Sequence, residues 1–170
     1  MSLNKIKLIT DFSLSRIIHG LWRLEDWNLD KKDLVAFLEE IMEMGITSFD
    51  HADIYGDYSC EKIFGDALRL QPSLRKDMQI ITKCGIKLRS NKYPERKLQI
   101  YDYSYQHILQ SAEQSLQYLG IDTIDLLLLH RPAPFFDPEE VIRAFDALYQ
   151  TGKVRYFGVS NFTPRQFEML

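Results

Sequence analysis

Short apolar runs alternate with amphipathic segments along most of the chain. Five runs rich in apolar and β-branched residues are bounded by turn residues, which predicts strands. They lie at 17–22, 46–50, 79–83, 124–130 and 156–160. Between them, apolar residues recur three and four positions apart, the spacing of a helix with one buried face. The sequence therefore predicts helices at about 31–44, 59–70, 104–119 and 138–151, and a fifth from 163 onward.

The predicted helices have typical boundary residues. Asp30 stands where an N-cap is expected, because its carboxylate can accept from the first free backbone N–H groups. Gly45 follows the same helix, as a left-handed residue after the last turn often does. Asp137 and Pro138 place an N-cap and an N1 proline at the fourth helix. The chain therefore consists of five predicted strand–helix units.

Near-continuous apolar strands such as Leu126–Leu129 indicate a parallel sheet whose two faces are both covered. A doubly wound sheet and a (β/α)₈ barrel both accept this order of elements. The turn after the first strand, Gly20-Leu21-Trp22-Arg23, lacks the G-x-G-x-x-G pattern of a dinucleotide-binding turn, which disfavours a Rossmann nucleotide site. A barrel needs eight units and about 250 residues. We therefore expect residues 1–170 to form a single domain, the first five units of a longer (β/α)₈ (TIM) barrel chain.

One segment is too long for an ordinary connection between a strand and a helix. Residues 85–102 are polar and include several Lys and Arg side chains. The segment is expected either to fold over other residues or to be mobile. We interpret its basic part, Lys87 to Lys97, as a solvated flap over the barrel mouth rather than as a nucleic-acid site.

Composition narrows the class of protein without identifying it. The chain has 170 residues, 45% of them hydrophobic, and a formal net charge of −3. These values fit a folded globular protein and give no basic excess, so we expect no nucleic-acid partner. No apolar run reaches the roughly 18 residues of a membrane span, so we expect no membrane partner. Two separate cysteines, Cys60 and Cys84, and an N-terminus without a signal-peptide pattern predict a cytoplasmic protein.

Polar residues of complementary chemistry stand at the ends of the predicted strands. Asp50, Lys83 and His130 each end a strand, and Tyr55 follows Asp50 closely. In a barrel the C-terminal strand ends converge on one mouth, where catalytic groups lie. A free tyrosine is a poor acid near neutral pH, but a nearby ammonium favours its phenolate form. Such a group could protonate a carbonyl oxygen as hydride arrives at carbon.

Four motifs, FDHADIYG, TKCG, LLLLHRP and GKVRYFGVSNF, follow one another along the chain. From about Ile17 to the last residue the sequence resembles the aldo-keto reductase family, in its bacterial branch. The resemblance implies a (β/α)₈ barrel that reduces aldehydes or ketones with a nicotinamide cofactor, usually NADPH. It also implies a small-molecule carbonyl compound as the substrate.

The same resemblance assigns roles to residues. It implies Tyr55 as the general acid, Lys83 as the cation that favours the ionised phenol, and Asp50 as the partner of Lys83. His130 would orient the substrate carbonyl, and Trp22 would line the substrate pocket.

By the same resemblance, Ser160 and Asn161 correspond to positions that bind the nicotinamide carboxamide, and Asp50 to one near the nicotinamide ribose. The family has about three further units, which hold the rest of the cofactor. The resemblance therefore leaves open whether a 170-residue piece binds the cofactor and is active.

Two other functions are compatible with parts of this sequence. His51 and Asp53, with Asp50 and His130, could form a His/Asp metal site of a barrel hydrolase. The first strand lacks the H-x-H pattern of those enzymes and Lys83 would repel a cation, so we expect no metal. A regulatory subunit that holds the cofactor with slow turnover stays open as an alternative to a reductase.

Overall fold

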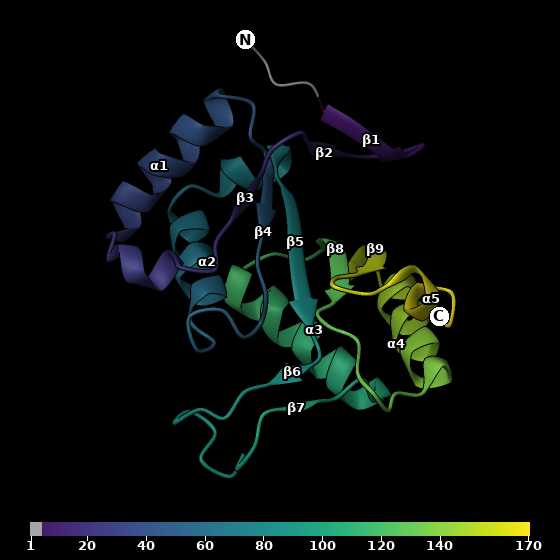
Figure 1. The fold of residues 1–170 in the computed structure, drawn as a ribbon. Helices are drawn as coiled ribbons and strands as arrows, with labels where there is room; N and C mark the ends of the chain where they lie inside the picture. The colour runs from purple at the N-terminus through teal and green to yellow at the C-terminus, as the bar shows by residue number, and fades with distance from the viewer. Residues whose placement is uncertain (1–4) are drawn as a thin grey trace.

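Five parallel strands form the centre of the computed structural model, which describes residues 5–170 (Figure 1). Their order in the sheet is their order along the chain, with every neighbouring pair parallel. The strands are β3 (Ile18–Gly20), β4 (Ser48–Asp50), β5 (Gln79–Cys84), β8 (Ile124–Leu129) and β9 (Val154–Val159). All five predicted strands are thus confirmed, although the first is shorter than 17–22. The order is that of an incomplete barrel.

Helices on one face of the sheet connect the strands, as the sequence pattern predicts (Figure 1). The Asp30 carboxylate accepts from the N–H groups of Lys32 and Asp33, which confirms the first N-cap. Gly45 has a φ of 88°, the left-handed conformation expected after that helix. The elements are η1 (Leu24–Trp27), α1 (Lys31–Glu43), α2 (Cys60–Leu70), η2 (Pro72–Asp77), α3 (Tyr105–Leu119), α4 (Pro138–Gln150) and α5 (Pro164–Phe167).

The larger hydrophobic core lies between the helices and the sheet. Alternation along the strands directs Phe49, Ile80 and Leu127 to this side, where all three are fully buried. Phe64 of α2 packs against Phe49 with ring centroids 5.6 Å apart. Each such side chain contributes about 1.5–3 kcal/mol when it leaves water. This core therefore fixes the strands, and with them the residues at their ends.

A close approach between α2 and α3 depends on Gly65. A Cβ atom at this position would lie 2.0 Å from the carbonyl oxygen of Tyr118 and 2.7 Å from the carbonyl carbon of Leu119. Gly65 therefore lets the C-terminal end of α3 pass directly over α2.

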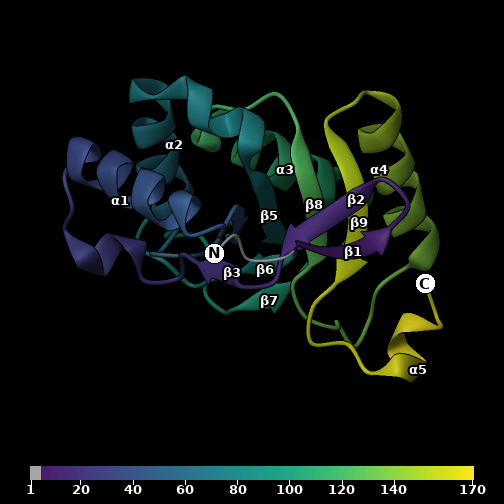
Figure 2. The same cartoon turned by 90° about the horizontal axis from the view of Figure 1, so that it is seen from above.

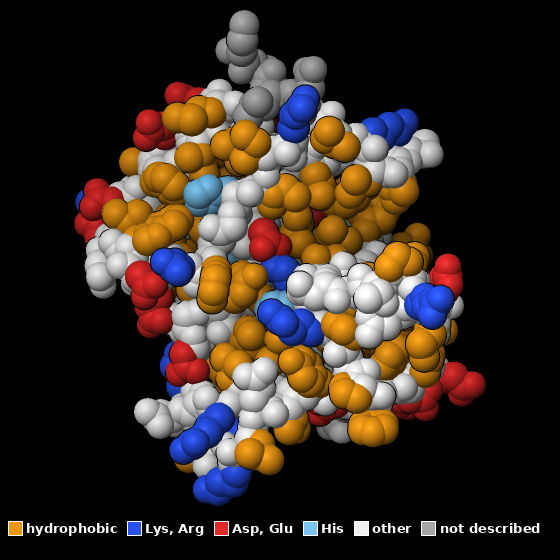
Figure 3. All heavy atoms as spheres, in the orientation of Figure 1, with side chains coloured by type: hydrophobic (Ala, Val, Ile, Leu, Met, Phe, Trp, Pro, Cys, Tyr) orange, Lys and Arg blue, Asp and Glu red, His pale blue; other side chains and the backbone are white. Residues whose placement is uncertain are grey.

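A hairpin at the N-terminus covers the other face of the sheet (Figure 2). It consists of β1 (Lys5–Ile9) and β2 (Phe12–Ser15), which the sequence analysis did not predict. Phe12 stacks on Tyr156 with ring centroids 4.4 Å apart, and with Leu14 and Ile81 it forms a second, smaller core. Figure 3 shows apolar side chains gathered beneath the hairpin on this face. The hairpin lies toward the ends at which the strands begin (Figure 1).

The long segment after β5 folds over other residues. β6 (Ile86–Lys87) pairs antiparallel with β7 (Ile100–Tyr101). The hydroxyl of Tyr58 accepts from the Leu88 N–H at 2.8 Å and from the Arg96 guanidinium at 2.9 Å. Arg96 also lies 3.6 Å from the centre of the Tyr93 ring. Of the two possibilities left open by the sequence, the structure shows the folded one.

Within residues 5–170, none of the helices combines the length and apolar character needed to cross a membrane.

Candidate active site

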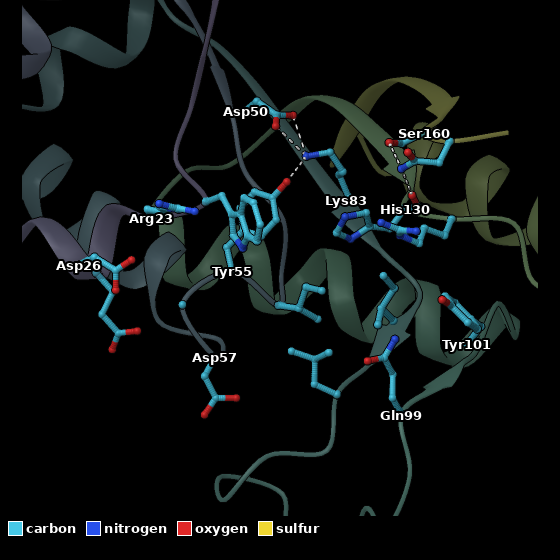
Figure 4. Close-up of a pocket in the computed structure, with 18 residues that line it drawn as sticks. Arg23, Asp26, Asp50, Tyr55, Asp57, Lys83, Gln99, Tyr101, His130 and Ser160 are labelled. Carbon is cyan, nitrogen blue, oxygen red and sulfur yellow. Dashed lines mark hydrogen bonds and ion pairs between the residues drawn. The ribbon is translucent and has the colours of Figure 1, made fainter.

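A cleft of about 950 Å³ opens at the ends where the strands finish (Figure 4). Its walls come from the segments that follow β3, β4, β5, β8 and β9, and from β6 and β7. Every site residue predicted from the sequence lines it, namely Trp22, Asp50, Tyr55, Lys83, His130, Ser160 and Asn161.

Lys83 is the centre of the polar contacts in this cleft. Its ammonium donates to the carboxylate of Asp50 at 2.8 Å, the carbonyl of His51 at 2.7 Å and the phenol oxygen of Tyr55 at 3.0 Å (Figure 4). The three donors of the ammonium are thereby used. Only 7% of the Lys83 side chain is exposed, so the charge is held in a largely dry place beside a carboxylate.

Strand register explains why Asp50 and Lys83 meet. Asp50 lies opposite Ile81 in the parallel pairing of β4 and β5. Lys83 follows Ile81 by two positions, and side chains two apart point to the same face of a strand. The β4–β5 pairing therefore brings the acid and the amine together without help from a loop.

Tyr55 stands in the turn that follows β4. Its ring lies 5.9 Å from the imidazole of His130 and 6.4 Å from the indole of Trp22, measured between centroids. The next three residues, Gly56, Asp57 and Tyr58, have positive φ angles of 57°, 49° and 67°, which turn the chain back toward α2. The phenol of Tyr55 thus lies between an ammonium, an imidazole and an indole.

His130 directly follows β8 and is neutral at ordinary pH. Burial and the positive charges of Lys83 and Arg131 lower the pKa of its imidazole to about 4. The backbone N–H of His130 donates to the Cys84 carbonyl at 3.0 Å, and the backbone carbonyl of His130 accepts from the Asn161 amide at 3.1 Å. These bonds fix the main chain of His130 at the cleft, and a neutral imidazole placed there can donate one hydrogen bond to a carbonyl oxygen in the cleft.

Ser160 and Asn161 offer polar groups to a ligand in the cleft. The Asn161 amide nitrogen donates to the His130 carbonyl and to the Ser160 hydroxyl at 2.9 Å. Its amide oxygen accepts no hydrogen bond within the described part of the chain. An amide oxygen in this state suits the NH₂ of a carboxamide, so these residues fit the nicotinamide end of a cofactor.

Two buried acids, Glu61 and Asp53, lie next to the end of β5 that holds Lys83, and their burial was not predicted from the sequence. Glu61 is 2% exposed and accepts from the Thr82 hydroxyl at 2.6 Å. Burial raises the pKa of Glu61 to about 7, and it also raises the pKa of Asp53 well above its usual range. The burial of Glu61 could have been predicted from its position three residues before Phe64, which places it on the apolar face of α2.

Glu61 makes stability depend on pH. An acid whose pKa is raised by folding binds its proton more tightly in the folded state, so stability is lost as pH rises. The loss begins near the ordinary pKa of about 4.3 and is complete above about 7. We expect Glu61→Gln, which keeps an oxygen for Thr82, to lose less stability between pH 5 and 8.5 than the parent.

Thermal unfolding at the two pH values measures this difference, with the exposed Glu43→Gln as the control. Equal losses in the parent and in Glu61→Gln would contradict the assignment.

His51 packs into the core, beside Phe64 with ring centroids 4.5 Å apart. It is fully buried, and burial lowers the pKa of its imidazole to about 3. Residues 5–170 contain no cluster of three His, Cys, Asp or Glu side chains able to hold a metal ion.

Comparison with known proteins agrees with this geometry. Residues 16–170 match the profile of the Aldo/keto reductase family. The chain therefore belongs to that family of oxidoreductases.

Among curated relatives, the uncharacterized oxidoreductase YcsN of Bacillus subtilis (strain 168) is 53% identical over 99% of this chain and 56% of its own length. Oxidoreductase YdhF of Escherichia coli (strain K12) is 53% identical over 92% of this chain and 52% of its own length. A 6-dehydroglucose reductase of Agrobacterium fabrum is 42% identical over 99% of this chain and 57% of its own length. The chain thus spans about half the length of the curated relatives it matches.

Solved structures give the same result. The aldo-keto reductase AKR11C1 from Bacillus halodurans, in its holo form, superposes with a TM-score of 0.81 at 28% identity, over 98% of this chain and 53% of that one. The glycerol dehydrogenase AKR11B4 from Gluconobacter oxydans superposes with a TM-score of 0.82 at 31% identity, over 99% of this chain and 52% of that one. The fold is therefore the first part of an aldo-keto reductase barrel.

Proposed function

We propose that the protein reduces the carbonyl group of a small aldehyde or ketone to an alcohol with NADPH, in the cytoplasm. The observation that carries the proposal is the contact of the Tyr55 phenol with the buried Lys83–Asp50 pair at the floor of an open cleft. Family membership supports oxidoreductase chemistry of this kind.

In the proposed reaction the Tyr55 hydroxyl gives its proton to the carbonyl oxygen as the carbon is reduced. The phenolate that remains is stabilised by the Lys83 ammonium 3.0 Å away, and Asp50 holds that ammonium in place. His130, neutral at ordinary pH, donates a hydrogen bond to the same carbonyl oxygen and orients it toward Tyr55. Trp22 lines the substrate side of the cleft. General acids of this kind contribute about 10²- to 10⁴-fold in rate.

Ser160, Asn161 and Asp50 would hold the nicotinamide end of the cofactor, through amide, hydroxyl and carboxylate groups that line the cleft. A reduced nicotinamide bound there would supply the hydride. No metal is needed in this scheme, because the proton donor and the neighbouring cation are both side chains of this chain.

A cofactor-holding regulatory subunit is the second candidate. One relative, from Schizosaccharomyces pombe, is a putative voltage-gated potassium channel subunit beta, 33% identical over 77% of this chain. Both functions would use the same cleft, and they differ in turnover.

Reduction of simple aldehydes by the full-length protein tests the proposal. We expect oxidation of NADPH, followed by its absorbance, to require both the protein and the aldehyde. Tight cofactor binding without turnover across a panel of aldehydes and ketones would favour the regulatory subunit instead.

A further inference from the structure

Arg131 brings a positive charge to the cleft without an acidic partner. It follows His130 directly, is exposed and lines the cleft. Within residues 5–170 its guanidinium forms no ion pair and no hydrogen bond; the bonds of this residue come from its backbone. Lys83, in contrast, is already paired with Asp50. The guanidinium of Arg131 therefore contributes no visible contact to the fold.

The backbone of Arg131 is nevertheless held firmly. The phenol oxygen of Tyr103 accepts from the Arg131 N–H at 3.1 Å and donates to the Arg131 carbonyl. Tyr103 is 3% exposed and packs over Gly85, where a Cβ atom would lie 1.8 Å from the Tyr103 ring. A buried phenol thus fixes the position from which the Arg131 side chain starts.

Charge is distributed unevenly around the cleft. Asp26 and Asp57 lie on the side of Tyr55 away from His130 (Figure 4). The Arg131 charge lies on the His130 side, close enough to help to lower the pKa of that imidazole. Arg23 lines the cleft on the same side as these acids (Figure 4). A ligand whose carbonyl lies between Tyr55 and His130 would therefore meet carboxylates together with Arg23 at one end and the Arg131 guanidinium at the other.

We propose that Arg131 binds an anionic group, a carboxylate or a phosphate, carried by the carbonyl substrate. This inference rests on the proposed reductase function and names the substrate class of the same site. A planar guanidinium suits the recognition of both anions, because it can donate two parallel hydrogen bonds. Binding an anion costs Arg131 little free energy, because its exposed guanidinium has no ion pair that must first be broken.

Matched pairs of aldehydes test the proposal in the full-length protein. Succinic semialdehyde and butyraldehyde differ mainly in a terminal carboxylate, and glyceraldehyde 3-phosphate and glyceraldehyde differ in a phosphate. We expect Arg131→Gln to lower kcat/KM for the preferred anionic member of these pairs by about 10- to 100-fold, the effect of a lost hydrogen bond to a charged group. The neutral partner should change less than about twofold, and Arg131→Lys should restore part of the loss.

Arg89→Gln is the control, because it removes an exposed positive charge that does not line the cleft. It should leave both members of each pair unchanged. Equal losses with charged and neutral aldehydes in Arg131→Gln would overturn the proposal and show that Arg131 acts on His130 or on the fold. A raised KM for NADPH with unchanged aldehyde discrimination would also overturn it.

Binding of unreactive anions separates this inference from the proposed function. Succinate and inorganic phosphate are titrated into the protein saturated with cofactor and followed by calorimetry. Even if no aldehyde is reduced, we expect at least one of these anions to bind the parent and to bind Arg131→Gln at least tenfold more weakly. Equal binding by the two proteins, or no binding to either, would overturn the role of Arg131.

Discussion

Tyr55→Phe is expected to lower kcat for aldehyde reduction by about 10²- to 10⁴-fold, the usual contribution of a general acid. The substitution removes the hydroxyl that accepts from the Lys83 ammonium in the cleft, while the ring can keep its place beside His130 and Trp22. Cofactor affinity should change little, because Ser160 and Asn161 remain. Steady-state kinetics and a fluorescence titration with NADPH measure the two effects separately.

Tyr149→Phe provides the matched control, since Tyr149 is exposed on α4 and does not line the cleft. Its kcat should equal that of the parent. A Tyr55→Phe variant that kept its rate would show that another group supplies the proton. A Tyr55→Phe variant that also lost cofactor binding would show that the phenol hydroxyl maintains the structure of the cleft.

Gly65→Ala is expected to destabilise the protein by about 3 kcal/mol, at the upper end of the usual range for overpacking. Alanine normally favours a helix over glycine by about 1 kcal/mol, so propensity alone predicts the opposite sign. Packing determines the sign of the stability change here, because the new methyl group would lie 2.0 Å from the Tyr118 carbonyl oxygen, which is backbone and cannot rotate away. Either α2 or α3 must shift.

Urea unfolding measures this change, with Gly20→Ala as the control. A Cβ atom at Gly20 meets no atom within 4 Å, so its effect should stay within about 0.5 kcal/mol. If Gly65→Ala were as stable as the parent, the approach of α3 to α2 would be looser than the structure shows.

Much of the fold can be predicted from local patterns. Caps such as Asp30 and periodic apolar residues define the helices, and the strands between them follow from short apolar runs. The hairpin of β1 and β2 was missed, because its residues Lys5–Ile9 are exposed and its partners lie far along the chain. Contacts such as Phe12 with Tyr156 depend on tertiary packing, which no local pattern contains.

The candidate site was predictable for a different reason. Parallel strands finish at one edge, so polar residues at strand ends such as Asp50, Lys83 and His130 must lie near one another. The groups that support them were not predictable. Tyr103 and Glu61 look like ordinary helix or loop residues in the sequence, and only the packed structure shows that both are buried.

The contact between Asp50 and Lys83 also depends on the number of residues in β5. Because strand side chains alternate, one inserted or deleted residue between Gln79 and Lys83 would turn the ammonium toward the helices and present a neighbouring side chain to the cleft. The fold would tolerate two inserted residues better than one, since two preserve the parity of the strand. The length of β5 is therefore constrained by the contact between Asp50 and Lys83, a constraint that the loops at the ends of the strand do not share.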